Sequence, residues 1–260
     1  MAGIKPRTVF NAENRAYKSK QYPPFLGEQL ALHDTVNVMY PELEELYLLQ
    51  RSQTWTENEI NLQQSRMDMI QSRQEEIDIM VKVSYLWEAD SVASRSILPV
   101  FAPFITNSEL NEMMTEQTRF EVIHGKTYSE IVRQCVTDPQ KVLDETMKNE
   151  EILSRTDTII QAFDEVIKYG ALYSLGSEYT NKDIPKEKYM EVILKGIFAL
   201  YLLERIQFMS SFAVVFGLAE RDRFKGIADL VKLIAKDELC TTGEHSVLTP
   251  NGWVELKDLE

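Results

Sequence analysis

Apolar residues recur at helical spacing along most of the chain. Residues 34–50 carry Leu43, Leu46 and Leu49, and residues 75–100 carry Ile77, Met80 and further apolar positions. Side chains three or four positions apart share one face of a helix, so each run can bury an apolar stripe. The pattern predicts helices over residues 34–50, 75–100, 109–135, 156–175, 186–219 and 224–239, with another after Asp138-Pro139.

The segments between these runs are punctuated by turn and cap residues. Pro99 and Pro103 interrupt the second run, and Asn107-Ser108 can cap the helix that follows. Residues 1–30 show no clear period and are predicted to be an irregular arm, and residues 176–185 read as a polar loop. No convincing strand pattern precedes residue 240, so the expected class is an all-α helical bundle.

The last 21 residues follow a different pattern. Val247-Leu248-Thr249 and the run 253–256 flank Pro250-Asn251-Gly252, and Asn-Gly between two such runs favours a β-hairpin. The sequence therefore predicts three parts: an arm over 1–30, a helical domain over 31–239 and a hairpin tail over 240–260.

Composition narrows the classes of function. The net charge of −13 argues against direct nucleic-acid binding, and two cysteines, Cys135 and Cys240, do not make a disulfide framework. The most apolar stretch, 197–218, contains Glu204, Arg205 and Gln207, so it predicts a buried helix and no membrane span. The N-terminus lacks the apolar core of a signal peptide. The expected location is the cytoplasm, or the host cytoplasm for a viral protein.

Two patterns within the predicted helices indicate metal chemistry. Glu121 and His124 form an E-x-x-H motif, which places a carboxylate and an imidazole on one helix face. Glu204 lies in the middle of the most apolar helix, where an unpaired carboxylate costs several kcal/mol. The alternatives are a solvated face for the first pair and, for Glu204, an ion pair with Arg205 or a neighbouring helix.

Carboxylates on two further helices extend the pattern. Asp90 lies late in the run 75–100, and Glu238 ends the last predicted helix. A second E-x-x-H motif would need histidine at position 241, where the sequence has Thr241. Four helices that each give a carboxylate, with one complete E-x-x-H pair, are typical of a ferritin-like di-metal bundle.

At this point the chain resembles a known family. The region from about Leu43 to residue 239 is similar to the small (radical-generating, β) subunit of class I ribonucleotide reductase. The stretches that carry the resemblance are Asp90-Ser91, Glu121-Val-Ile-His124-Gly-Lys-Thr-Tyr128-Ser, Thr137-Asp138-Pro139, Glu204-Arg-Ile-Gln-Phe208-Met-Ser-Ser-Phe212 and Ile234-Ala-Lys-Asp237-Glu238.

The resemblance implies a role for each matching residue. Two iron ions, or manganese, would be bound by Asp90, Glu121 and His124 on one side and by Glu204 and Glu238 on the other. Tyr128 would carry a stable tyrosyl radical inside an apolar pocket of Phe208, Phe212 and Ile234. Trp55 and Asp237 would begin the radical-transfer path. The implied partners are a large subunit and a second copy of the chain in a homodimer.

The tail also resembles a known element, the opening block of an intein. The sequence that begins Cys240-Thr-Thr-Gly-Glu-His follows Glu238 and takes the place of the second E-x-x-H motif. By this resemblance Cys240 would be the splicing nucleophile. The other intein motifs are absent from the chain, so splicing would need a complementary C-terminal intein/extein polypeptide or the continuation of a longer gene. The alternative is an ordinary hairpin tail with a chance cysteine.

Two other functions remain open from sequence. One is another ferritin-like di-iron oxidase or an iron-storage protein, and the other is a helical interaction protein without metal. Tyr128 with Phe208 and Phe212 argues against storage, and a buried Glu204 argues against the interaction protein.

Overall fold

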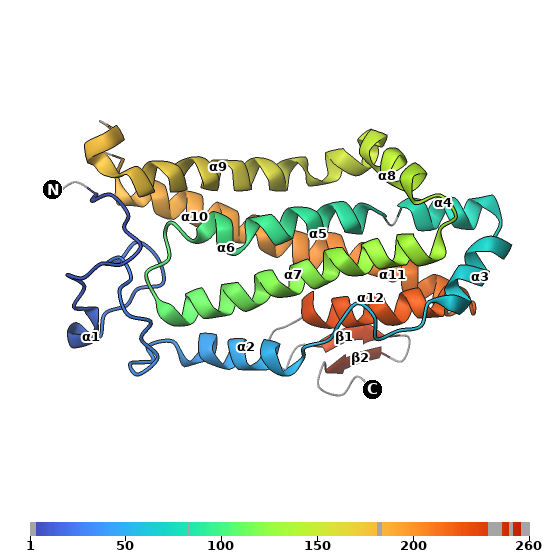
Figure 1. Ribbon diagram of the computed structural model, residues 1–260, viewed down its shortest axis with the longest axis horizontal. Helices are drawn as coiled ribbons and strands as arrows, with labels where there is room; N and C mark the ends of the chain where they lie inside the picture. The colour runs from blue at the N-terminus through green and yellow to red at the C-terminus, as the bar shows by residue number, and fades with distance from the viewer. Residues whose placement is uncertain (1–3, 83, 181–183, 239–245, 250–251, 256–260) are drawn as a thin grey trace.

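Long helices packed side by side form the body of the molecule (Figure 1). The computed structural model describes residues 4–82, 84–180, 184–238, 246–249 and 252–255. The bundle is built from α2 (Pro41–Ser52), α5 (Ser84–Ser96), α7 (Ser108–Cys135), α9 (Glu150–Thr180), α10 (Lys186–Leu202), α11 (Phe208–Ala219) and α12 (Lys225–Glu238). Shorter helices are α1 (Ala16–Ser19), α3 (Gln63–Gln71), α4 (Gln74–Lys82), α6 (Leu98–Phe101) and α8 (Pro139–Lys148). The predicted helical class is confirmed for this body.

The central helix, α7, begins where the sequence predicts. The Asn107 side chain accepts a hydrogen bond from the backbone N–H of Leu110, which satisfies one of the free donors at the helix start. Asp138 caps α8 in the same way through the N–H of Lys141. α7 packs against α2 and α5, so its buried face lies in the middle of the bundle. This position carries Glu121 and His124 into the core.

Several predicted boundaries are wrong. The first helix begins at Pro41 and not at residue 34, because residues 34–37 form a turn in which the Asp34 carboxylate accepts from the N–H groups of Val36 and Asn37. The run predicted as one helix over residues 75–100 forms three helices, α4, α5 and α6. The pattern does not predict α3, because its residues show no clear apolar period. The arm contains α1, and Phe25 forms a bridge with Ile105.

The long helix predicted over 186–219 contains a π-helical turn, η1 (Leu203–Gln207), between α10 and α11. Glu204 lies in this turn. The predicted helix over 156–175 extends to Thr180, with a non-helical residue at Gly176, where φ is +76°. An added Cβ at Gly176 would lie 2.6 Å from the Ile4 carbonyl oxygen, so glycine allows both this backbone angle and the close approach of the arm.

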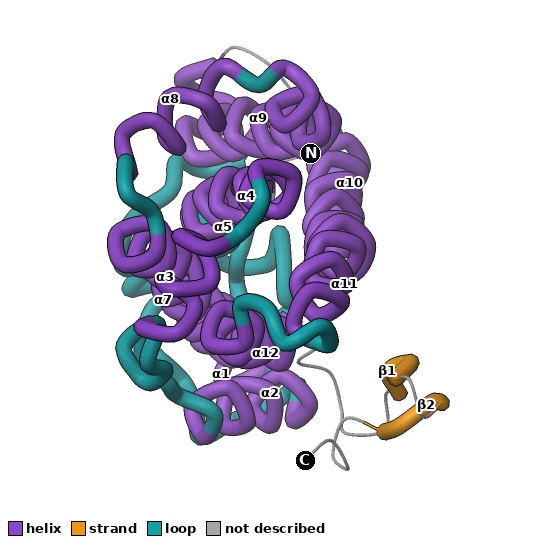
Figure 2. The backbone as a smooth tube through the Cα atoms, turned by 90° about the vertical axis from the view of Figure 1, so that its right-hand side faces the viewer, coloured by secondary structure: helices purple, strands orange, loops and turns teal. Residues whose placement is uncertain are grey.

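The hairpin lies beside the helical bundle (Figure 2). Strands β1 (Ser246–Thr249) and β2 (Gly252–Glu255) pair antiparallel, with Val247 opposite Val254 and Leu248 opposite Trp253. Gly252, which the sequence places between the strands, pairs with Thr249 and begins β2. Cys240 and Thr241 lie outside the described residues.

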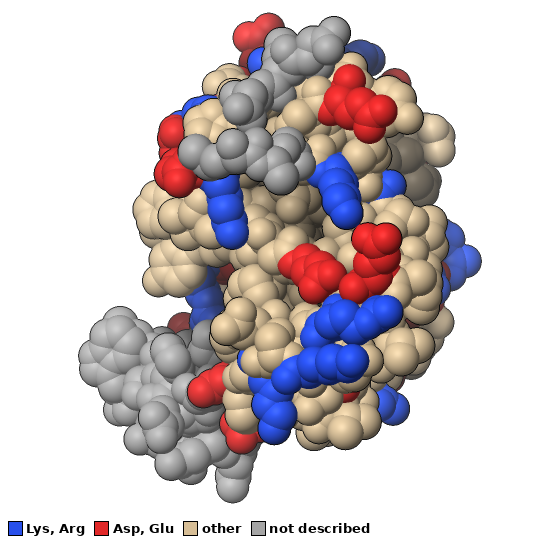
Figure 3. All heavy atoms as spheres, turned by 90° about the vertical axis from the view of Figure 1, so that its left-hand side faces the viewer, with Lys and Arg blue, Asp and Glu red and all other residues tan. Residues whose placement is uncertain are grey.

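The described surface carries charged side chains of both signs. Figure 3 shows Lys and Arg side chains together with Asp and Glu side chains on one end of the molecule. None of the helices in the described residues is long and apolar enough to cross a membrane.

Candidate metal centre

Four of the proposed ligands converge at the centre of the bundle. Asp90 comes from α5, Glu121 and His124 from α7, and Glu238 from the end of α12. Each offers one ligand atom, and these atoms all lie within 4.8 Å of one another. All four residues are buried. Segments far apart in sequence thus form one compact cluster of three carboxylates and an imidazole.

The imidazole of His124 uses its two nitrogens differently. Nδ1 faces the carboxylates, 3.0 Å from Glu238, 3.4 Å from Asp90 and 3.6 Å from Glu121. Nε2 lies 3.1 Å from the Asp237 carboxylate. A histidine that binds metal through one nitrogen usually contacts a carboxylate or carbonyl through the other. The ring is therefore oriented so that Nδ1 is the donor available to a metal.

Several buried polar atoms of the cluster have no hydrogen-bond partner among the described residues. They are both carboxylate oxygens of Asp90 and Glu204, one oxygen each of Glu121 and Glu238, and Nδ1 of His124. Leaving a buried polar atom unpaired costs about 1–3 kcal/mol, and more for a charged group. This donor set of oxygens plus one imidazole nitrogen fits a hard or borderline cation such as iron or manganese.

The pKa shifts of the cluster also favour a bound cation. Burial raises the pKa of Asp90, and burial together with the Glu238 carboxylate raises the pKa of Glu121 well above its usual range. Burial also raises the pKa of Glu238 to about 7. Burial alone would lower the pKa of His124, but the surrounding carboxylates raise it well above its usual value. A bound cation would relieve the repulsion that these acidic groups impose on one another.

Glu204 faces the same site without joining the tight cluster. It is buried and lines a cavity of about 400 Å³ together with Glu121, His124, Asp237 and Glu238. Neither carboxylate oxygen of Glu204 has a hydrogen-bond partner among the described residues. The carboxylate is therefore available to a ligand in that cavity.

Trp55 and Asp237 lie in direct contact with the cluster. The indole Nε1–H of Trp55 donates to the Asp237 carboxylate at 2.6 Å, and the same oxygen contacts His124. The Trp55 ring stacks on the imidazole with a centroid distance of 6.0 Å. The structure thus joins three residues that lie far apart in the sequence into one hydrogen-bonded chain.

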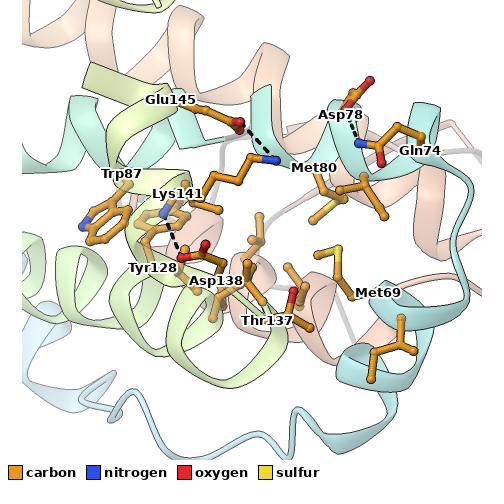
Figure 4. A pocket seen from close by; sticks show the side chains of 18 residues that line it. Met69, Gln74, Asp78, Met80, Trp87, Tyr128, Thr137, Asp138, Lys141 and Glu145 are labelled. Carbon is orange, nitrogen blue, oxygen red and sulfur yellow. Dashed lines mark hydrogen bonds and ion pairs between the residues drawn. The ribbon is translucent and has the colours of Figure 1, made fainter. Parts of the chain in front are cut away.

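Tyr128 is buried one helical turn beyond His124, and its hydroxyl has no hydrogen-bond partner among the described residues. Burial, followed by the charge of Asp90, raises the pKa of this phenol. With Trp87, Tyr128 lines a mainly apolar cavity of about 400 Å³ that also contains Met69 and Met80 (Figure 4).

The three predicted pocket residues are fully buried. Phe208 and Phe212 stack at 6.0 Å in α11, and Ile234 lies in α12. They are absent from the cavity that Tyr128 lines, whose apolar residues include Trp87, Ile131, Ile227 and Val231. Their role around Tyr128 stays a prediction.

One set of hydrogen bonds near the site could not be predicted from the sequence. Tyr85 of α5 donates a hydrogen bond of 2.5 Å from its hydroxyl to the side-chain oxygen of Gln207, the last residue of the π-helical turn η1. The Gln207 amide in turn donates to the backbone carbonyl of Arg155. These contacts anchor the turn that contains Glu204. Nothing in the local sequence signals them, because the partners lie more than 50 positions apart.

Comparison with known proteins finds relatives of the whole helical region. The family model for the ribonucleotide reductase small chain matches residues 33–246. The ribonucleoside-diphosphate reductase subunit beta of Haemophilus influenzae is 32% identical over 237 residues, covering 87% of this chain and 62% of that protein. The subunit beta of Aquifex aeolicus is 24% identical over 259 residues, covering 97% of this chain and 34% of that protein.

The fold has a solved counterpart. The ribonucleotide reductase R2 subunit from Clostridium botulinum superposes with a TM-score of 0.75 at 21% identity, over 92% of this chain and 69% of that one. This likeness shows the fold alone. The chain spans about 62% of the length of the first curated relatives that it matches. With the family model covering most of its length, the chain belongs to the ribonucleotide reductase small chain family.

Proposed function

We propose that the chain is the upstream part of the small subunit of a class I ribonucleoside-diphosphate reductase. In this proposal its helical domain binds two iron ions, for which manganese is the alternative, beside a radical-bearing tyrosine. The observation that carries the proposal is the buried cluster of Asp90, Glu121, His124 and Glu238, in which several inward-facing atoms lack a hydrogen-bond partner among the described residues. The finished subunit would act as a homodimer with a large subunit that reduces ribonucleotides.

Each ligand has an assigned place. Asp90, Glu121 and His124 would hold one ion, and Glu204 and Glu238 would hold the other. A metal pair bound there would supply the oxidising power for the one-electron oxidation of Tyr128. The buried phenol is protonated at neutral pH because burial raises its pKa, so its proton must leave together with the electron. Burial also shields the resulting tyrosyl radical from water and reductants.

The contacts of Asp237 support a path for the radical. Its carboxylate accepts from the Trp55 indole and touches His124, so it links the imidazole to an oxidisable ring. In the proposal, Trp55 and Asp237 carry the oxidising equivalent between the metal centre and the large subunit. The Trp55 N–H can pass its proton to Asp237 when the ring is oxidised.

The metal and radical assignments are tested in the complete, ligated subunit. Two metal ions per chain and a tyrosyl signal in electron paramagnetic resonance are expected. Tyr128→Phe should keep both metals and lose the signal, whereas Tyr173→Phe, at a tyrosine of α9, is the matched control and should retain it. Glu204→Ala should lower metal content. An unchanged metal content in Glu204→Ala, or a tyrosyl signal in Tyr128→Phe, would refute the assignment.

We also propose that an intein begins at Cys240. The change from helical to hairpin pattern supports it, as do the pairing of β1 with β2 and the comparison with Aquifex aeolicus. That match omits only about 3% of this chain, so it includes Cys240 and β1, and the relative is much longer than the others. In the first step the Cys240 thiol would attack the Leu239 carbonyl. A thioester forms, the amide bond breaks, and the Cys240 nitrogen becomes a free amine.

The splicing step is tested with a complementary polypeptide that carries the remaining intein and its downstream flank. The expected products are a ligated subunit and a thioester at Leu239 that added thiols cleave. Cys240→Ala removes the nucleophile and should abolish both products while the helical domain stays folded. Ligation by the Cys240→Ala chain would show that the junction or the nucleophile lies elsewhere.

A further inference from the structure

The π-helical turn η1 is held in place by side chains of two other helices. Within the turn, the backbone N–H of Phe208 donates to the carbonyl of Leu203, which is the wider spacing of a π-helix. The last residue of the turn, Gln207, accepts a hydrogen bond of 2.5 Å from the Tyr85 hydroxyl of α5. The Gln207 amide donates at 3.2 Å to the backbone carbonyl of Arg155 in α9. Gln207 therefore ties η1 to both α5 and α9.

The wider turn separates the directions of two side chains. Glu204 and Gln207 are three positions apart, so in an α-helix they would point about 60° from each other. A π-turn has more residues per turn, so three positions complete a smaller part of the circle and the two side chains diverge further. In the structure Gln207 contacts α5 and α9, whereas Glu204 lines the cavity beside the ligand cluster of α7 and α12. The direction of Glu204 thus depends on the place and shape of this turn.

The groups that hold the turn are themselves fixed. Tyr85 is only 2% exposed, and the Arg155 guanidinium lies 5.5 Å from the centroid of its ring. Thr156, the next residue of α9, is fully buried, and its hydroxyl donates to the Glu88 carboxylate of α5 at 2.6 Å. This second contact joins α9 to α5 one helical turn from Tyr85. The two helices therefore form a rigid support for Gln207.

We infer that Tyr85 is a positioning residue for Glu204 and, through it, for the second metal ion of the proposed centre. This inference rests on the proposed function, in which Glu204 is a metal ligand. Tyr85 and Asp90 both belong to α5, so the helix that supplies a carboxylate to the cluster also fixes the turn that carries Glu204. Metal–oxygen distances tolerate little change, so a small rotation of the turn is enough to weaken the second site.

The alternative is that the Tyr85 hydrogen bond contributes to packing alone. In that case its removal lowers stability and leaves the direction of Glu204 unchanged. Tyr85→Phe separates the two roles because it keeps the ring and removes only the hydroxyl. Tyr189→Phe, in α10, is the matched control, since Tyr189 is also buried and its hydroxyl makes no hydrogen bond within the described residues.

The first measurement is hydrogen exchange of the backbone amides of residues 203–208 in the 260-residue chain without metal. Tyr85→Phe should speed this exchange about threefold or more, since the loss of a hydrogen bond favours local opening. Exchange in α8 should stay as in the wild type, and Tyr189→Phe should change neither region. An exchange rate of residues 203–208 that Tyr85→Phe leaves unchanged would overturn the inference.

The second measurement is the Kd of the ligated subunit for Mn²⁺, followed through the electron paramagnetic resonance signal of free Mn²⁺. Tyr85→Phe should raise the Kd of the weaker site about tenfold, the usual effect of removing a group that orients a ligand. Gln207→Leu removes the same hydrogen bond from the partner side and should raise this Kd by a similar factor. The double variant should add little to either single change, because both act on one contact.

Glu204→Ala distinguishes positioning from packing. If Tyr85 acts through Glu204, Tyr85→Phe added to Glu204→Ala should leave the Kd within about twofold of Glu204→Ala alone. A further tenfold rise in that background, or an unchanged Kd in Tyr85→Phe with a folded chain by circular dichroism, would overturn the inference and leave the proposed function intact. An unchanged Kd in Glu204→Ala itself would refute the ligand assignment of the proposed function, and the inference with it.

Discussion

At the scale of single residues, the contacts of Asp237 are the most consequential. One carboxylate oxygen accepts from the Trp55 indole and contacts His124 Nε2, so a single atom fixes the orientation of both rings. The remaining ring nitrogen of His124 is thereby directed into the carboxylate cluster. The orientation of the nitrogen that faces the carboxylates therefore depends on Asp237, a residue outside that cluster.

Trp55→Phe tests this dependence. The substitution keeps an aromatic ring against His124 but removes the N–H donor to a carboxylate, a bond that contributes about 1.5–3 kcal/mol. Unfolding by denaturant should show a loss of stability in that range. Trp87→Phe is the control, because the indole N–H of Trp87 makes no hydrogen bond within the described residues. Equal losses in the two variants would show that ring size, and not the hydrogen bond, determines the effect.

The lowered pKa of Asp34 predicts that the stability of the protein depends on pH. Burial alone would raise the pKa of its carboxyl, but hydrogen bonds from Asn37, Tyr22 and the Val36 N–H lower the pKa overall. A pKa below the unfolded value of about 3.9 means that the contribution is present above that pH and lost as pH falls through the folded pKa. The difference in unfolding free energy between wild type and Asp34→Asn should thus be largest above about pH 5 and shrink toward pH 3.

The matched variant for this measurement is Asp144→Asn, at an aspartate of α8 whose side chain is 73% exposed. Its difference from wild type should stay small across the same pH range. A difference in unfolding free energy between wild type and Asp34→Asn that stays constant with pH would contradict the proposed role of the carboxylate.

At the scale of elements, the packing of α10 sets the position of the turn that holds Glu204. Gly196 of α10 allows close contact with α6 and α9, since an added Cβ would lie 2.6 Å from Val166 Cγ2 and 2.9 Å from Phe101 Cζ. Both of those side chains are fully buried, so they have little room to move. Glycine is therefore needed here for space and not for backbone angle.

Gly196→Ala should lower stability by up to about 2 kcal/mol, because an overpacking cost of about 1–3 kcal/mol outweighs the gain of about 1 kcal/mol from better helix propensity. Gly217→Ala in α11 is the control, since nothing lies within 4 Å of its added Cβ. That variant should be unchanged or more stable by up to about 1 kcal/mol. The midpoints of denaturant unfolding measure both. Stabilisation by Gly196→Ala would show that α10 shifts freely.

At the scale of the whole molecule, the proposed function expects a further metal ligand beyond those that the described residues provide. The described residues place one imidazole in the cluster, and Glu204 faces an open cavity with both oxygens unpaired. In the proposed subunit, a downstream segment closes that cavity and supplies the missing ligand. Metal affinity should therefore depend on joining the two parts.

The 260-residue chain alone should bind fewer than two iron ions per chain and give no stable tyrosyl signal. The ligated subunit should reach full loading under the same conditions. Elemental analysis and electron paramagnetic resonance measure the two quantities. Full loading together with a radical in the isolated chain would contradict the view that the cavity needs a downstream segment.

The local pattern of apolar and capping residues was sufficient to predict much of the helical architecture. Apolar periodicity and the caps Asn107 and Asp138 predict α7 and α8 closely, because helix formation depends on neighbours within one or two turns. The same locality places Glu121 and His124 on one face, and it identifies Glu204 as a buried carboxylate. Turn chemistry similarly predicts the β1–β2 pairing.

Only the tertiary structure decided how these pieces meet. The convergence of Asp90, Glu121, His124 and Glu238, the Trp55–Asp237 bond and the Tyr85–Gln207 contact all join residues that are distant in sequence. The π-helical turn at Glu204 and the existence of α3 also escaped the pattern. The physical reason is common to all of them: their energies come from packing and hydrogen bonds between elements, which the periodicity of a single segment does not encode.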